Sequence, residues 1–351
     1  MKKMSIYIDK IFPNIKTGLC NVGFLLGAGT SKGAGYPIGK DLTKLVIEKL
    51  GQQEKNIIEK LLKDKNITYN FKEGIPDIEI LADMILKERT TIQSDNLLKI
   101  ENLIRKDIIE VFAEIKVPIL TSHIKFLSLI KKLCQNRAVS VWLFTTNYDL
   151  LLELAAMQVK VPIYNGFEGI FARYFDIDKI DLVHGTKKIF FYEYKEPIIK
   201  LIKLHGSISW YKKNNEIYEI SNNYPRKEDF ERIMILPNIE KTFECMENPY
   251  DKLFRYANQI IGNQCKYLVS CGYSFRDRHI NEQLIIPKLK EGKIRLFSLS
   301  QDLSPEMEIF KSYNTFNYLT KSEQYIDKAI TKEESDLWKF DKFIEFVDNQ
   351  S

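Results

Sequence analysis

Two side chains that stand far apart in the sequence could together hold a sugar hydroxyl and activate water. His205 follows an apolar stretch, and an imidazole at the end of a strand could act as a general base near neutral pH. Asn147 lies in the run Thr-Thr-Asn-Tyr-Asp, where its amide could bind a ribose hydroxyl or water and the Asp149 carboxylate could hold a second hydroxyl. Only the fold can bring these groups to one place.

Each of these residues also has a purely structural interpretation. Asn147 and Asp149 could form an Asx turn in which Asp149 begins the next helix. His205 could cap its strand by hydrogen bonding to the backbone. His184 also precedes a glycine, but it follows a less apolar stretch and is treated as a decoy. The other two histidines fall in predicted helices and are expected to be structural or surface residues: His123 and His279.

A glycine turn after an apolar strand has the properties of an anion site. Gly27 and Gly29 allow backbone N–H groups to approach a phosphate without obstruction by Cβ, and Thr30 and Ser31 add hydroxyl donors. The pattern G-x-G-x-x-G of dinucleotide dehydrogenases would require glycine where this chain has Lys32, so hydride transfer is disfavoured. A turn of small residues without any ligand is the alternative.

A second glycine segment could bind the other half of a dinucleotide. Gly272 directly follows a predicted strand, and Ser274 is a candidate contact for an adenosine. Arg276 could approach a diphosphate; the alternative is a charge network with its neighbours Asp277 and Arg278.

Composition and charge exclude several classes of protein. The net charge of +5 is spread along 351 residues without a block of one sign, so direct nucleic-acid binding is not predicted. The cysteines form no C-x-x-C pair, and neither a metal site nor a disulfide framework is expected. Asp9 and Lys10 interrupt the apolar residues near the N-terminus, and no run approaches the ~20 residues of a membrane span, so we expect a cytoplasmic protein.

Alternating strand and helix signals predict an α/β protein with a Rossmann-like, mostly parallel sheet. A strand, turn and helix unit is expected over 21–50, with Tyr36 and Pro37 opening the helix. Further strands are predicted at 138–144, 189–194, 198–204, 217–220, 232–236, 267–271 and 293–299, further helices at 249–261, 278–290 and 335–347, and loops at 166–185 and 212–215.

Three regions are predicted from these elements. Residues 1–51 and 137–300 form the nucleotide-binding catalytic core. Residues 52–136 carry apolar side chains at helical spacing and form a helical insertion. Residues 301–351 form a C-terminal extension with an amphipathic helix.

Four segments resemble, in order, the motifs of the sirtuin-like proteins: residues 27–37, 146–149, 204–207 and 272–277. The exact sequences T-T-N-Y-D and G-Y-S-F-R-D resemble those of the bacterial branch used in antiphage defence. By this resemblance Asn147 matches the catalytic asparagine of the family and His205 its catalytic histidine, while Asp149 positions the ribose or nicotinamide end. The residues that it assigns to NAD binding are Gly27, Ala28, Gly29, Thr30, Ser31, Tyr36, Pro37, Gly272, Ser274 and Arg276.

The resemblance implies hydrolysis of NAD, as a substrate, to nicotinamide and ADP-ribose, which would deplete the cofactor of an infected cell. The chain lacks the zinc-binding cysteines of the protein-deacylase branch, so water is the expected acceptor and no metal is predicted. An NAD- or ADP-ribose-binding assembly module without turnover and an NAD-dependent protein deacylase are the alternatives.

Such a hydrolase must be controlled, and the chain leaves little length for a sensor. We therefore expect control by assembly, either as a homo-oligomer or with a HerA-type hexameric ATPase, which the resemblance suggests as a partner. The helical insertion and the C-terminal helix are the candidate contact surfaces.

Overall fold

The computed structural model describes residues 8–11, 18–67, 76–115, 117–134, 137, 139–181, 196–221, 224–225, 227–236 and 247–350. The strand predicted at 189–194 and the decoy His184 lie outside these residues.

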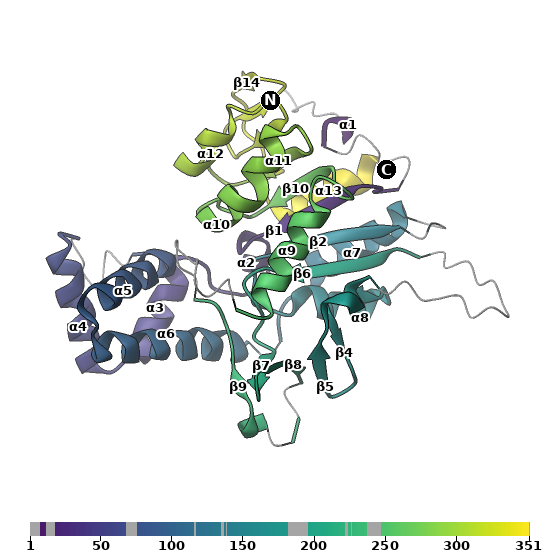
Figure 1. The fold of residues 1–351 in the computed structure, drawn as a ribbon. Helices are drawn as coiled ribbons and strands as arrows, with labels where there is room; N and C mark the ends of the chain where they lie inside the picture. The colour runs from purple at the N-terminus through teal and green to yellow at the C-terminus, as the bar shows by residue number, and fades with distance from the viewer. Residues whose placement is uncertain are drawn as a thin grey trace.

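A nine-stranded sheet in the order β14-β13-β12-β11-β10-β1-β2-β6-β3 forms the centre of the fold (Figure 1). Every neighbouring pair from β3 to β12 is parallel, and only β13 and β14 at one edge are antiparallel. The predicted α/β class with a mostly parallel, Rossmann-like sheet is confirmed. The strands are β1 Val22–Leu26, β2 Ser140–Thr145, β3 Ile163–Tyr164, β6 Ile198–Lys203, β10 Tyr267–Cys271, β11 Arg295–Leu299, β12 Phe316–Leu319, β13 Gln324–Ile326 and β14 Ala329–Thr331.

Both faces of this sheet are covered, which explains why its central strands are continuous apolar runs. Along β2, Val141 and Leu143 belong to the core under α7, α8 and α13, whereas Trp142 and Phe144 belong to the core under α9 and α11. The covering helices are α7 Thr121–Leu133, α8 Leu151–Val159, α9 Tyr250–Ile260, α11 Ile286–Lys290, α12 Pro305–Phe310 and α13 Phe340–Gln350. Three shorter helices are α1 Ile8–Ile11, α2 Gly29–Lys32 and α10 Arg278–Ile280, and a π-helical turn, Asn281–Ile285, joins α10 to α11.

Four helices form a separate block beside the sheet (Figure 1). These are α3 Lys40–Lys49, α4 Gln52–Asp64, α5 Ile78–Ile92 and α6 Asp95–Ala113, and they enclose a third apolar core. The side chains of Asp77 and Ser94 accept N–H groups at the starts of α5 and α6, as N-cap residues do. α7, the last helix predicted within 52–136, packs on the sheet instead of in this block.

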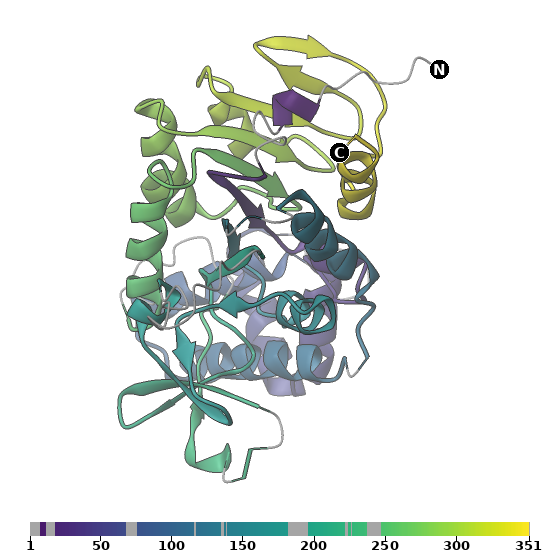
Figure 2. The ribbon, with the colours of Figure 1, turned by 90° about the vertical axis from the view of Figure 1, so that its right-hand side faces the viewer.

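A small antiparallel sheet, in the order β4-β5-β8-β7-β9, projects from the opposite side of the fold to the C-terminal strands (Figure 2). Its strands are β4 Phe167–Glu168, β5 Ala172–Phe175, β7 Trp210–Lys213, β8 Glu216–Ile220 and β9 Glu231–Arg232. The prediction of a loop from residue 166 onward was therefore wrong for β4 and β5. These strands are too short, and too interrupted by polar residues and Gly169, to produce a strand pattern.

Other boundaries also differ from the predictions. β7 continues through Lys213 into the loop predicted at 212–215, and β2 and β11 each begin two residues later than predicted. α3 begins at Lys40 and not at Tyr36, because Gly39 has a φ of +52°, which a right-handed helix cannot contain. The strand predicted at 232–236 ends at Arg232, and Met234 to Leu236 are apolar because they are buried. The C-terminal helix begins at Phe340 instead of at residue 335. Among the described helices, none combines the length and apolar composition needed to cross a membrane.

Candidate functional site

The four sequence motifs lie at the carboxyl ends of four adjacent strands. Leu26 at the end of β1 pairs with Cys271 of β10 on one side and with Thr145 of β2 on the other, and Thr145 pairs with Lys203 of β6. The residues that directly follow these positions therefore share one edge of the sheet. The chain order reverses between β1 and β10, which is where open α/β sheets bind ligands.

The two glycine turns pack against each other through their backbones. Gly27 N–H donates to Cys271 O and Gly29 N–H donates to Gly272 O, both at 3.0 Å. A Cβ on Gly27 would lie 2.5 Å from Gly272 O, and one on Gly29 would lie 2.8 Å from Gly272 Cα. The glycines permit a close approach between two turns of the protein, whereas the predicted approach was to a phosphate.

Few hydrogen-bond donors of the first turn remain available to bind an anion. The N–H groups of Thr30 and Ser31 donate to Gly27 O and Ala28 O, and both side chains are buried. Ala28 and Gly29 are exposed, and Ala28 N–H has no acceptor among the residues that the structure describes. The Ala28 amide is thus the donor of this turn that a diphosphate could use.

The amide of Asn147 is oriented by the glycine turn. Its Nδ2 donates to Gly27 O at 3.1 Å, to Thr30 Oγ1 at 3.2 Å and to Ser31 Oγ at 2.9 Å. A backbone carbonyl can only accept, so Gly27 O requires that the nitrogen, not the oxygen, faces the turn. Asn147 is partly exposed. Its Oδ1 lies on the opposite side of the amide from Nδ2 and can accept a hydrogen bond.

Asp149 supports this arrangement from the interior. Its Oδ2 accepts from Ser31 Oγ at 2.6 Å, and its Oδ1 accepts from Leu151 N–H at 3.0 Å at the start of α8. The carboxylate is buried and both of its oxygens are bonded within the protein. Asp149 therefore ties the glycine turn to the Asn147 segment.

His205 is held by a carboxylate from the segment that follows β10. The imidazole is 6% exposed, and its Nε2 lies 2.6 Å from Asp277 Oδ2. Asp277 is equally buried, and its Oδ1 accepts from Ile280 N–H at the start of α10. A carboxylate at Nε2 favours the tautomer that carries its proton there, which leaves the lone pair of the neutral ring on Nδ1.

The sequence placed Asp277 among charged neighbours, and its contact with His205 was not predicted. A signal was present, because apolar and polar residues alternate from Tyr273 to Arg276, which assigns position 277 to the buried face of the segment. Of Arg276 and Asp277, only the exposed Arg276 had been considered as a ligand contact.

The remaining predicted residues have different environments. Tyr36 is buried, and burial together with the charges of Asp149 and Glu153 raises its pKa to about 12. Ser274 is exposed on the second turn. Arg276 instead pairs with Asp77 of the helical block at 3.1 Å. Pro37 is half-buried in the segment that leads to α3.

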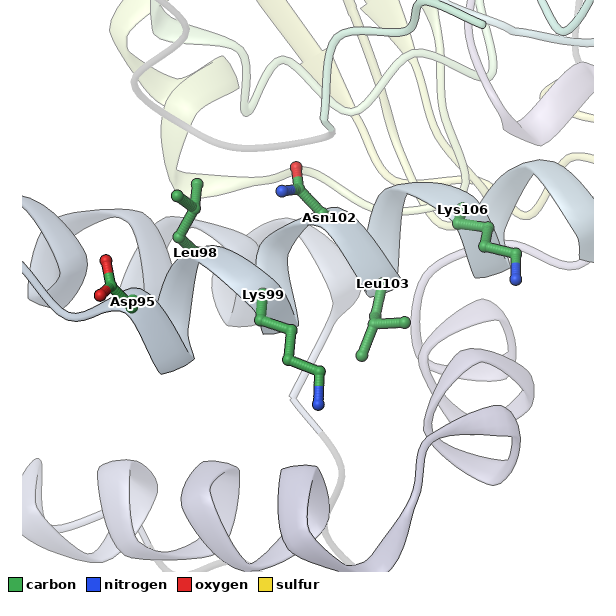
Figure 3. A pocket seen from close by; sticks show the side chains of 6 residues that line it. All are labelled: Asp95, Leu98, Lys99, Asn102, Leu103 and Lys106. Carbon is green, nitrogen blue, oxygen red and sulfur yellow. The ribbon is translucent and has the colours of Figure 1, made fainter. Parts of the chain in front are cut away.

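Surface hollows border the helical block. One has a volume of about 630 Å³, and its lining includes Tyr36 and Pro37 together with residues of α3 and α6. Another has a volume of about 520 Å³, and all of its lining residues come from α6: Asp95, Leu98, Lys99, Asn102, Leu103 and Lys106. Figure 3 shows Leu98 and Asn102 directed to one side of this helix and Lys99 and Leu103 to the other, so their side chains do not converge on a ligand. Within the described ranges, no group of three or more His, Cys, Asp or Glu side chains is arranged to hold a metal ion.

Comparison with known families agrees with the strand-end geometry. Residues 141–314 match the SIR2-like domain family. This match supports a sirtuin-like family, whose members are generally NAD-dependent enzymes. The SIR2-like region contains Asn147, His205 and Asp277, whereas the glycine turn at Gly27 precedes it. A comparison with curated proteins found no match to this chain.

A buried histidine near this site predicts sensitivity to acid. Burial lowers the pKa of His123 below its usual 6.5, although the charge of Asp149 opposes this. The unfolded chain therefore takes up this proton first, and stability is lost as the pH falls below about 6.5. The thermal midpoint of His123→Leu should fall less than that of the wild type between about pH 7.5 and about pH 5.5. Equal falls in both proteins would exclude His123 as a source of the acid sensitivity.

Proposed function

We propose that this chain hydrolyses NAD at the bond between nicotinamide and ribose, releasing nicotinamide and ADP-ribose. The observation that carries this proposal is the register of β2 with β6. Because Thr145 pairs with Lys203, Asn147 and His205 each stand two residues beyond a paired position, on adjacent strand ends of the SIR2-like region. An amide acceptor and a buried imidazole with a carboxylate partner suit the activation of water beside a ribose.

In the proposed reaction, a bond forms between the water oxygen and C1′ of the ribose while the bond from C1′ to the nicotinamide nitrogen breaks. The bonding electrons leave with nicotinamide, which neutralises its positive charge. His205 accepts the proton of the water, and the Asp277 carboxylate stabilises the imidazolium that results. Asn147 Oδ1 accepts from a ribose hydroxyl or from the water, and Asp149 keeps that amide in place through Ser31.

For NAD binding, we propose that the exposed turn residues contact the dinucleotide and the buried ones shape the turn. Ala28 N–H would donate to the diphosphate, and Ser274 would contact the adenosine half. Arg276 could reach the diphosphate only after leaving Asp77. Gly27 and Gly29 would keep the two turns in contact. The remaining assigned residues would support these contacts from behind: Thr30, Ser31, Tyr36, Pro37 and Gly272.

We further propose that this activity depletes NAD during antiphage defence and is controlled by assembly. The resemblance of T-T-N-Y-D and G-Y-S-F-R-D to the bacterial defence branch supports this role. Additional copies of the chain or a HerA-type ATPase would act on the helical block α3–α6 or on α13.

Incubation of the purified chain with NAD alone, followed by measurement of nicotinamide, tests the proposal. We expect release without any peptide, whether immediately or after addition of a HerA-type ATPase. Release that requires an acylated peptide would identify a deacylase. Thermal stabilisation by NAD without release under either condition would identify a binding module.

Replacement of Asn147 with alanine should lower nicotinamide release by about 10²-fold, because the substrate loses an oriented acceptor and its position relative to His205. The measurement is initial rate at saturating NAD. Asn314→Ala is the matched control, since that amide is exposed in the turn before β12, at the opposite edge of the sheet, and its loss should leave the rate unchanged. A fully active Asn147→Ala would remove this residue from the mechanism.

A further inference from the structure

Lys203 is a charged residue of the site region that the proposed mechanism does not use. It is the last residue of β6 and is only 2% exposed. Burial of an ammonium is costly unless its protons are bonded and its charge is paired. Its Nζ donates to Asp149 O and, at 3.1 Å, to Ser207 Oγ, and it lies 2.8 Å from Glu153 Oε1.

The first two of these contacts belong to the two segments that must act together. Asp149 ends the Thr-Thr-Asn-Tyr-Asp segment that contains Asn147, and Ser207 lies two residues after His205. Backbone bonds connect the same segments, since Ile208 N–H donates to Tyr148 O at 3.0 Å. The ammonium is therefore a bridge between the loop of the amide and the loop of the imidazole.

The third contact pairs the charge of the ammonium, and the first two bond its remaining protons. Glu153 lies on α8 and is largely buried; its burial raises its pKa, and Lys203 opposes that rise. The bonds to Asp149 O and Ser207 Oγ add direction, because each fixes one loop relative to the same nitrogen.

We propose that Lys203 is a positioning residue, whose ammonium sets the distance between the Asn147 loop and the His205 loop so that amide and imidazole face the same substrate atoms. This inference rests on the proposed hydrolysis of NAD. Lys203 touches neither substrate nor proton in this role, so its loss should affect kcat far more than KM.

Two variants separate positioning from neutralisation of charge. Lys203→Met keeps the length of the side chain, and we expect it to lower kcat for nicotinamide release by about 10²-fold with KM for NAD within about threefold of wild type. It should also lower the thermal midpoint, because Glu153 is left without its partner. Lys203→Met combined with Glu153→Gln removes both charges; it should recover the thermal midpoint but not kcat. Wild-type kcat in the double variant would overturn the inference.

If the Lys203 variants do not fold, a milder substitution tests the same inference. Ser207→Ala removes the contact of the ammonium with the His205 loop, together with the bonds of Ser207 Oγ to Tyr148 O and Ser209 Oγ, and leaves the ion pair intact. It should lower kcat about tenfold with KM unchanged. An unchanged kcat in Ser207→Ala would overturn the inference while the proposed function stands. A wild-type chain that neither alone nor with a HerA-type ATPase releases nicotinamide would overturn both.

Discussion

Replacing His205 with alanine should lower nicotinamide release from NAD by about 10²- to 10⁴-fold, the range expected for loss of a general base. NAD should still bind, because the proposed contacts of the dinucleotide lie on the glycine turns and not on the imidazole. The rate is measured with saturating NAD, and binding is measured separately as the shift in thermal midpoint that NAD produces. Full activity in His205→Ala would exclude the mechanism proposed above.

Two neighbouring substitutions show whether such a loss comes from chemistry or from damage to the fold. Asp277→Asn keeps an oxygen that can accept from Ile280 N–H, but it removes the charge that stabilises a protonated His205, so the rate should fall by an intermediate amount. His279 lies on α10 with its ring 4.2 Å from Phe254 and outside the site. His279→Ala should therefore retain the wild-type rate.

The edge of the sheet on which these residues stand could be predicted from the sequence. β10 has the bounds that its apolar run predicts, and β1 and β2 differ from prediction by only a few residues. A buried parallel strand must be apolar on both faces, so its end can be recognised in the sequence where a polar residue or glycine follows the apolar run. Because parallel strands share their carboxyl edge, finding the strand ends also located the candidate residues.

The partners of the candidate residues could not be predicted, because they depend on pairing between distant segments. Nothing near His205 in sequence indicates Asp277, which comes from a strand on the far side of β1. The small sheet also depends on pairing between distant segments. Ala172 pairs with Ile220, and strands of two to five residues gain their stability from such pairing. Local pattern could not distinguish them from loops.

The glycine turn is the position where the sequence pattern and the structure differ most, and Gly27→Ala tests the difference. A Cβ there would meet Gly272 O and Tyr273 Cα, each at 2.5 Å, and backbone atoms cannot rotate away as a side chain can. We expect a loss of about 3 kcal/mol or more in stability, seen as a fall of more than about 5 °C in the thermal midpoint, together with loss of nicotinamide release.

Gly33 provides a matched control in the same segment. It has a φ of −67°, and a Cβ there would meet nothing within 4 Å. Gly33→Ala should therefore be neutral or stabilise the protein by about 0.4–1 kcal/mol through the unfolded state. If Gly27→Ala instead kept the wild-type thermal midpoint and only weakened NAD binding, the glycine would serve the diphosphate and not the second turn. The two substitutions thus decide whether Gly27 is required by the fold itself or by a ligand.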